Sequence, residues 1–249
     1  MDNSLLVSLS QQLAAYRSMD VIANNLANVS TPGFKRESAK FEEYITQVAP
    51  AEGETGTQSL SFVKDAGVSR DLSQGGLQST NAPFDLAITG NGYFTVQTPQ
   101  GMRYTRDGHF TLDASGTLVN SDGHALQGDS GAITITPDDQ HVSIGKDGTI
   151  SSVVNGLSST IGKVSLVDFA DDRALTKQGA NLYSTSQTAT AATGATINQG
   201  MLESSNVQPV LEISHMIEVM RAYQATASLN QSQEDLTRQA IDKLGAMPN

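Results

Sequence analysis

The sequence predicts an α+β protein: the N- and C-terminal helices pair as one discontinuous domain, and a hairpin-rich antiparallel β domain is central. Two patterns support this prediction. Apolar residues recur every three or four positions over 5–29 and again over 210–244, as in amphipathic helices. The region between them consists of short β-branched runs separated by Gly-containing turns.

The N-terminal helix is expected to end around Asn28, because Thr31-Pro32-Gly33 follows and Pro32 cannot continue a helix. Residues 34–36 and 41–45 fit a second short helix or a strand equally well. Residues 50–59 have the Gly, Thr, Glu and Ser composition of an exposed loop.

The central region, from about 60 to 184, is divided by dipeptides that favour tight turns. These are Gln100-Gly101, Asp107-Gly108, Ser115-Gly116, Asp122-Gly123 and Asp147-Gly148. Their spacing predicts a β domain built from hairpins. Residues 185–196 are small and polar, and we expect them to link this domain back to the helical part.

The start of the C-terminal helix can be predicted, because proline is tolerated in the first turn of a helix. Pro209 therefore places the cap at 206–208, and Glu212 lies near the positive end of the helix dipole. The apolar residues change phase along this helix. Met216, Met220, Tyr223 and Ala227 follow one phase, whereas Leu229 and Leu236 are offset by two. A two-stranded coiled coil needs one phase, so we expect several packing partners.

The composition excludes several functions. The 249 residues are 38% apolar and 16% charged, enough for a core in one or two domains. A net charge of −11 without clusters of Lys and Arg argues against contact with nucleic acid or an anionic membrane. The absence of cysteine excludes disulfides, thiolate nucleophiles and zinc sites built on sulfur. The N-terminal helix carries only Asp2, Arg17 and Asp20 as charges, which favours close contact with other chains.

No apolar run approaches the roughly 20 residues of a membrane span, so no membrane insertion is expected. The start also lacks the charged leader and long apolar stretch of a secretory signal. We therefore expect a cytoplasmic protein, or one exported without a cleaved signal peptide.

Catalytic and metal-binding patterns are weak. Gly128-Asp129-Ser130-Gly131 resembles the nucleophile motif of trypsin-like proteases, but a triad also needs a placed His and Asp, and a turn is the better interpretation. Asp107-Gly108-His109 and Asp122-Gly123-His124 also fit turns better than a metal site. We expect no enzyme, no cofactor and no metal.

Several segments resemble the bacterial flagellar rod and hook axial proteins. They are Ala23-Asn24-Asn25-Leu26-Ala27-Asn28-Val29-Ser30-Thr31-Pro32-Gly33-Phe34-Lys35-Arg36, residues 86–94, residues 104–110, residues 200–207 and residues 216–223. The likeness covers the whole chain in order.

This resemblance implies a structural subunit of the proximal rod, which spans the periplasm and transmits torque, and which is exported unfolded through the flagellar type III apparatus. The distal rod protein of the same family and a secreted β-rich fibre or adhesin are the alternatives. The implied inner tube domain is 1–32 with 207–249, an intermediate segment is 33–75 with 186–206, and the outer β domain is 76–185. The implied partners are copies of itself and sibling rod proteins, with the surrounding rings and the export gate as further candidates.

The resemblance also gives an expected assembly interface on the terminal helices. Leu9, Leu13, Tyr16, Ile22 and Leu26 are expected to pack against Ile213, Met216, Ile217, Met220 and Tyr223. Asn24, Asn25 and Asn28 are candidates to bridge neighbouring subunits through their side-chain amides. Asn28 is equally well interpreted as the cap of the N-terminal helix.

Overall fold

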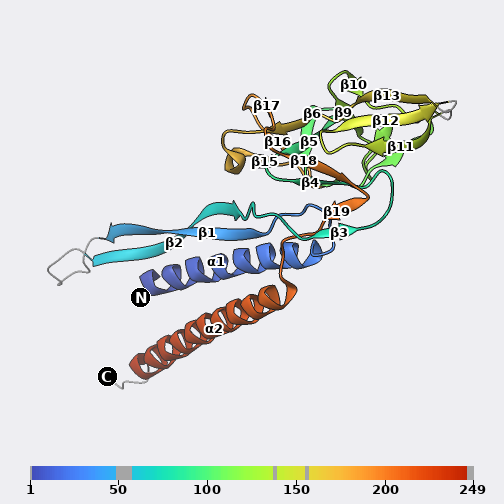
Figure 1. Cartoon of the computed structure of the whole chain (residues 1–249). Coiled ribbons are helices and arrows are strands. Elements are labelled where there is room, and N and C mark those ends of the chain that lie inside the picture. Colours follow the sequence, from blue (N-terminus) through green and yellow to red (C-terminus); the bar gives the residue numbers. More distant parts are fainter. Residues whose placement is uncertain (1, 49–57, 137–138, 155–156, 246–249) are drawn as a thin grey trace. The chain divides into compact units, whose positions relative to one another are not determined.

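The computed structural model describes residues 2–48, 58–136, 139–154 and 157–245, which form two compact units. The helical unit consists of Met1–Ala27, Glu37–Arg70 and Gln208–Asn249, and the β unit consists of Asn28–Arg36 and Asp71–Val207. Two terminal helices and a central set of antiparallel strands confirm the predicted α+β class (Figure 1).

The helical unit contains helix α1 (Asp2–Ala27), helix α2 (Pro209–Gly245) and a hairpin of strands β1 (Glu37–Val48) and β2 (Gln58–Arg70). Helix α1 ends one residue before the predicted Asn28, and Pro209 is the first residue of α2. The hairpin pairs from Glu37↔Arg70 to Val48↔Gln58, with a register shift after Ala39. Residues 41–45 are thus strand rather than helix.

The predicted loop at 50–59 lies mostly outside the described residues, and its last two residues, Gln58 and Ser59, belong to β2. Helix, hairpin and helix share one unit, so residues 37–70 group with the terminal helices. The expected intermediate segment 33–75 thus falls in both units: residues 37–70 belong to the helical unit, and residues 33–36 and 71–75 belong to the β unit.

The β unit begins with short strands that lie on both sides of its tight turns. The strands are β3 (Leu77–Ser79), β4 (Leu86–Thr89), β5 (Tyr93–Thr98), β6 (Gly101–Thr105), β7 (Thr111–Leu112), β8 (Leu118–Val119), β9 (Ala125–Gly128), β10 (Gly131–Ala132), β11 (Gln140–Ile144), β12 (Thr149–Val154) and β13 (Leu157–Lys163). They are followed by β14 (Leu166–Asp168), the 3₁₀ turn η1 (Asp172–Ala174), β15 (Thr176–Lys177), β16 (Tyr183–Ser184), β17 (Thr190–Ala191), β18 (Thr196–Gln199) and β19 (Met201–Glu203).

The main sheet of the β unit has the order β15-β16-β6-β5-β9-β8-β7, with β10 on β9, β14 on β5 and β17 on β14. Strands β11-β12-β13 form a second sheet, and β18 pairs with β4 and β19 with β3. Every named pair is antiparallel. The expected link at 185–196 is therefore wrong in part, because β17 and the first residue of β18 lie within it.

Four of the five predicted turn dipeptides lie in hairpins, and Asp107-Gly108 does not. The hairpins are β5–β6, β7–β8, β8–β9 and β11–β12. Gly148 has a φ of +87°, and a Cβ there would lie 2.7 Å from the carbonyl oxygen of Val164. Gly108 instead lies against the carbonyl oxygen of Leu86, so it is a close-approach glycine between β6 and β7, which do not pair.

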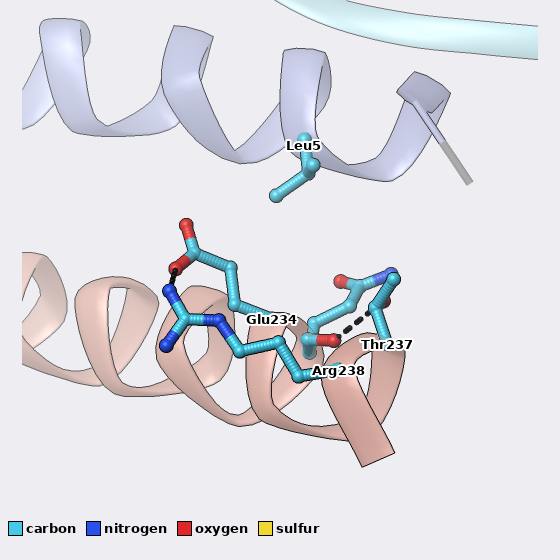
Figure 2. Close-up of a pocket in the computed structure, with 5 residues that line it drawn as sticks. Leu5, Glu234, Thr237 and Arg238 are labelled. Atoms are coloured by element: carbon cyan, nitrogen blue, oxygen red, sulfur yellow. Dashed lines mark hydrogen bonds and ion pairs between the residues drawn. The ribbon is translucent and has the colours of Figure 1, made fainter. Parts of the chain in front are cut away.

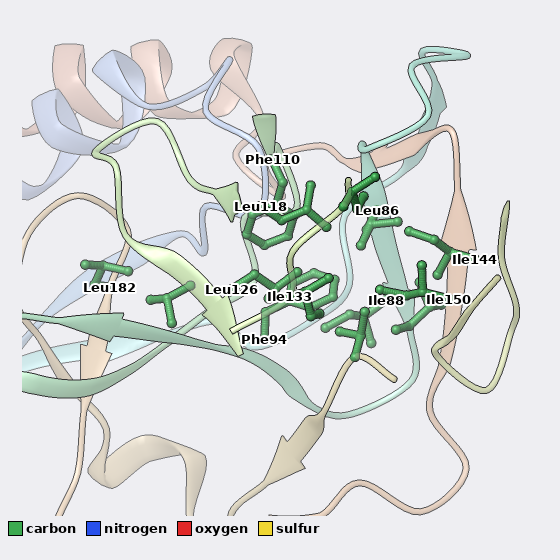
Figure 3. Close-up of a cluster of buried hydrophobic side chains, with 14 residues drawn as sticks. Leu86, Ile88, Phe94, Phe110, Leu118, Leu126, Ile133, Ile144, Ile150 and Leu182 are labelled. Atoms are coloured by element: carbon green, nitrogen blue, oxygen red, sulfur yellow. The ribbon is translucent and has the colours of Figure 1, made fainter. Parts of the chain in front are cut away.

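The hydrophobic core of the β unit is closed. Figure 3 shows its buried cluster, in which Leu86, Phe94, Leu118 and Ile150 are among the fully covered side chains. The rings of Phe94 and Phe110 meet edge to face, with centroids 5.3 Å apart. The core residues come from many short strands and from the segments between them, such as Phe110, Ile133 and Val164.

Candidate assembly surfaces

Between Leu6 and Ser18, helix α1 turns mostly small residues inward and four large apolar residues outward, whereas Val21 and Ile22 near its end are buried. Its half-buried positions include Ser10, Ala14, Ala15 and Ser18. Four large side chains spaced by three or four residues face solvent, and we call them the outer stripe: Leu6 (51% exposed), Leu9 (50%), Leu13 (63%) and Tyr16 (59%). This first part of α1 is the reverse of an ordinary amphipathic helix, whose large apolar residues face its own core.

Small residues on the inner face let the β1–β2 hairpin approach α1 closely. The backbone N–H of Val63 donates to Oγ of Ser10 at 3.3 Å. Near the same edge, Arg17 Nε lies 3.3 Å from Asp65 Oδ2, in a pair that is about half exposed and thus adds little stability.

Helix α2 presents one continuous line of half-buried residues, spaced alternately by three and four positions. These residues are Met216, Val219, Tyr223, Thr226, Asn230, Gln233 and Thr237, and we call them the inner line. Its phase is single, but its chemistry changes from apolar to polar after Tyr223. Leu229 (69% exposed) and Leu236 (65%) lie beside the inner line, which explains the phase change seen in the sequence.

One end of the helix pair is held by a buried hydrogen-bond cluster. Asn25 Nδ2 donates to Glu212 Oε2 at 3.0 Å and to the carbonyl oxygen of Glu37 at 2.7 Å. The N–H of Glu37 donates to Asn25 Oδ1 at 2.9 Å. Asn25 and Glu212 are both fully buried. This cluster therefore joins the end of α1, the start of α2 and the start of β1.

The other end of the helix pair is open. A cleft of about 590 Å³, which we call the far cleft, lies between the first half of α1 and the second half of α2. Its lining comprises Val7, Ser8, Gln11, Thr226, Leu229, Asn230, Ser232, Gln233 and Leu236. A neighbouring cavity of about 400 Å³ lies between Leu5 and the 233–238 turns of α2. Figure 2 shows Leu5 of α1 facing Glu234, Thr237 and Arg238 of α2 across this space.

The structure distributes the expected interface residues between the surface and the interior of the single chain. Exposed are Leu9, Leu13, Tyr16, Asn24, Ile213, Ile217 and Met220; half-buried are Leu26, Asn28, Met216 and Tyr223; and buried are Ile22 and Asn25. Leu9, Leu13 and Tyr16 therefore do not pack inside the single chain as expected. Mostly small residues occupy the inner face of this part of α1. Whether these side chains contact other subunits stays a prediction.

Asn25 and Asn28, which we expected to bridge subunits, both form hydrogen bonds within the chain. The Asn25 amide is used entirely within its own chain, by Glu37 and Glu212, so it does not reach the surface where a neighbouring subunit would lie. Asn28 directly follows α1, and its Oδ1 accepts from Thr31 Oγ1 at 3.1 Å, but its φ is not positive, so it does not form the left-handed cap that we expected.

A buried ion-pair cluster in the β unit was missed by sequence reasoning. Lys35 Nζ lies 2.6 Å from Glu203 Oε1, and Arg106 Nη1 lies 3.3 Å from Glu203 Oε2. All three side chains are less than a tenth exposed. Arg106 Nη2 also donates to the carbonyl oxygen of Gly90 at 2.7 Å. Burial lowers the pKa of Lys35, and the carboxylate of Glu203 opposes that shift.

This ion-pair cluster joins four of the five segments that carry the family resemblance, all but residues 216–223. Lys35 belongs to 23–36, Gly90 to 86–94, Arg106 to 104–110 and Glu203 to 200–207. Segments far apart in the sequence thus meet at one carboxylate. The occurrence of these segments together in one chain was the only sequence signal that they are related. It did not indicate that they contact one another through charged side chains.

The motifs that resemble catalytic or metal sites lie in a turn and at the surface of the β unit. Asp129 and Ser130 form the two-residue loop of the β9–β10 hairpin. His109 Nδ1 lies 2.8 Å from Asp85 Oδ1 at the surface of the β unit. Within the described ranges, no group of three or more His, Cys, Asp or Glu side chains is placed to hold a metal ion. No helix in the described part of the chain is long and apolar enough to cross a membrane.

Comparison with known proteins places this architecture in a family. Residues 5–35 match the model of the flagella basal body rod protein, residues 87–152 match the flagellar hook protein FlgE/F/G D1 domain, and residues 198–243 match the C-terminal model of the flagellar basal body rod FlgEFG protein.

Relatives match nearly the whole chain. The flagellar basal-body rod protein FlgF of Caulobacter vibrioides is 43% identical over 98% of this chain and 99% of its own length. FlgF of Mesorhizobium japonicum is 33% identical over 99% of both chains, and FlgG of Bacillus subtilis is 36% identical over 90% of this chain and 92% of its own. The chain therefore belongs to the family of flagellar basal-body rod proteins and is a structural subunit of the rod.

Proposed function

We propose that this rod subunit belongs to the proximal rod and polymerises through its helical unit, while the β unit faces outward. Its partners in this proposal are copies of itself and sibling rod proteins. The near-complete alignment with relatives named FlgF supports the proximal position. A distal subunit would use the same surfaces, and family membership sets aside the secreted fibre or adhesin.

The observation that carries this proposal is the distribution of apolar side chains. Among the described residues, 17 of the 21 exposed large hydrophobic side chains lie in the helical unit, whereas only Val21 and Ile22 of the buried hydrophobic ones do. Full burial of a Leu, Ile or Val side chain contributes about 1.5–3 kcal/mol. The single chain leaves these side chains exposed and so does not gain this free energy of burial. A rod in which they contact neighbouring subunits gains it.

Torque transmission follows from the same contacts. Many apolar contacts along two helices of 26 and 37 residues resist shear better than one small patch, because the load is shared over their length. The proposal includes export through the flagellar export apparatus before neighbouring copies order the helical unit.

Cryo-electron microscopy of purified basal bodies tests this function directly. The expected result is density for α1 and α2 in the inner wall of the rod at its proximal level. Density at the distal level would replace the proximal assignment with the distal one. Absence of this chain from the rod, in basal bodies that retain the rod, would contradict the proposal.

A further inference from the structure

The outer stripe and the far cleft lie on opposite sides of helix α1. Each residue advances the helix by about 100°. Positions 6, 9, 13 and 16 therefore point roughly opposite to positions 7 and 11 and about 120° away from position 8, and these three positions line the far cleft. The stripe of a chain cannot reach the far cleft of the same chain, but it is presented to another copy.

The stripe and the cleft have matching lengths. Leu6 to Tyr16 spans ten residue steps on α1, and Thr226 to Leu236 spans ten on α2. At about 1.5 Å per residue, each extends about 15 Å. The stripe therefore matches the α2 wall of the cleft in length, whereas the α1 wall, from Val7 to Gln11, is shorter.

The two surfaces also match in charge. No residue of the outer stripe is charged, and no residue that lines the far cleft is charged. Contact between them removes no ion from water, a step that costs several kcal/mol per unpaired ion. Val7, Leu229 and Leu236 offer the apolar walls against which Leu and Tyr side chains pack.

We propose that the outer stripe of one copy docks into the far cleft of the next copy. This inference rests on the proposed function and names the segment that fills the opening between the helices. Because the donating and receiving surfaces differ, the contact is heterologous and leaves a free stripe and a free cleft at the ends of each chain of copies. Each added copy therefore presents the same unfilled surface as the one before.

The absence of cysteine makes a direct test possible. Leu9→Cys and Leu229→Cys chains are co-expressed in a strain that lacks its own copy, and basal bodies are purified and treated with a short bismaleimide. The expected product is a covalent dimer that requires both variants, because neither chain carries both cysteines. Leu13→Cys with Leu236→Cys is the second pair, and Leu9→Cys with Ala66→Cys, on the exposed part of the hairpin, is the matched control without dimer.

Several outcomes would overturn the docking while leaving the proposed function intact. A dimer from Leu9→Cys alone would indicate symmetric contact of stripe with stripe. An adduct between the Leu229→Cys chain and a protein of another mass would assign the cleft to a sibling subunit. No dimer from either pair, with all variants present in the basal bodies, would exclude the contact. Absence of even the unaltered chain from basal bodies would instead refute the proposed function.

Discussion

The helical unit and the β unit treat apolar side chains in opposite ways. The β unit closes its core around residues such as Phe94 and Ile150, which no solvent reaches. The helical unit leaves Leu6, Leu9 and Leu13 at the surface, and the only buried hydrophobic side chains among its described residues are Val21 and Ile22. The difference teaches that the β unit buries its large apolar residues by its own packing, whereas the helical unit leaves most of its own exposed, as we expect of a unit that neighbouring chains complete.

Phe94→Ala is expected to produce the largest loss of stability. Removal of a fully buried Phe from a closed core costs about 3–5 kcal/mol, because a cavity remains. Thermal unfolding of the purified chain, followed by circular dichroism, measures the effect. Met102→Ala, at an exposed position of the same sheet, is the control and should change the free energy of unfolding by less than about 0.5 kcal/mol.

Leu13→Asp is expected to separate assembly from stability. The side chain is exposed in the single chain, so the unfolding temperature should stay nearly unchanged, while a charge at the subunit contact should abolish incorporation and swimming. Ile217→Asp is the corresponding change on α2, and Leu13→Met keeps the apolar character as the control. Normal swimming of both Asp strains would show that these positions are not at contacts.

Asn25→Ala tests the buried cluster that holds the two helices at one end. The change removes three hydrogen bonds and takes from the buried Glu212 carboxylate its Asn25 donor, at a cost of about 1–3 kcal/mol. Amide exchange near residues 20–27 and 209–216 should accelerate. Asn24→Ala, at the exposed neighbouring position, should have a smaller effect, and equal effects would contradict the structural role of Asn25.

Acid pH should affect the β unit through its turn aspartates, with the smallest effect of the series. Hydrogen bonds from the Thr149 side chain and backbone lower the pKa of Asp147 below its usual 3.8. A lowered folded-state pKa contributes stability above the unfolded pKa, and this stability is lost as pH falls through the folded value. Asp147→Asn should therefore weaken the β unit at neutral pH and make little difference below the folded pKa. Denaturant titrations at both pH values check this sign.

The elements of the fold were largely predictable, because their signals are local. Pro209 marked the start of α2, and the Gly-containing dipeptides marked four hairpins. Asp107-Gly108 was misjudged, because the same dipeptide that favours a turn also permits the close approach of the Leu86 carbonyl to Gly108. Sequence alone does not distinguish a glycine needed for its φ from one needed for its lack of a Cβ.

The site was less predictable, because it depends on contacts between distant positions. The apolar rhythm of α1 was correctly read as helical, but a rhythm does not reveal which face a single chain buries. Glu212 was assigned to the helix dipole, whereas the structure also gives it Asn25 as a buried partner. Lys35, Arg106 and Glu203 have no local pattern at all, since each appears in sequence as an ordinary charged residue.

The sequence separation of these contacts sets an order of events in time. Lys35 meets Glu203 across 168 positions, and Asn25 meets Glu212 across 187. If the chain is exported from its N-terminal end, as proposed, neither contact can form until almost the full length has arrived, because the last fifth supplies both carboxylates. Under the proposed assembly, incomplete chains would lack the finished surfaces on which another copy is added, so we expect elongation to proceed only by whole subunits.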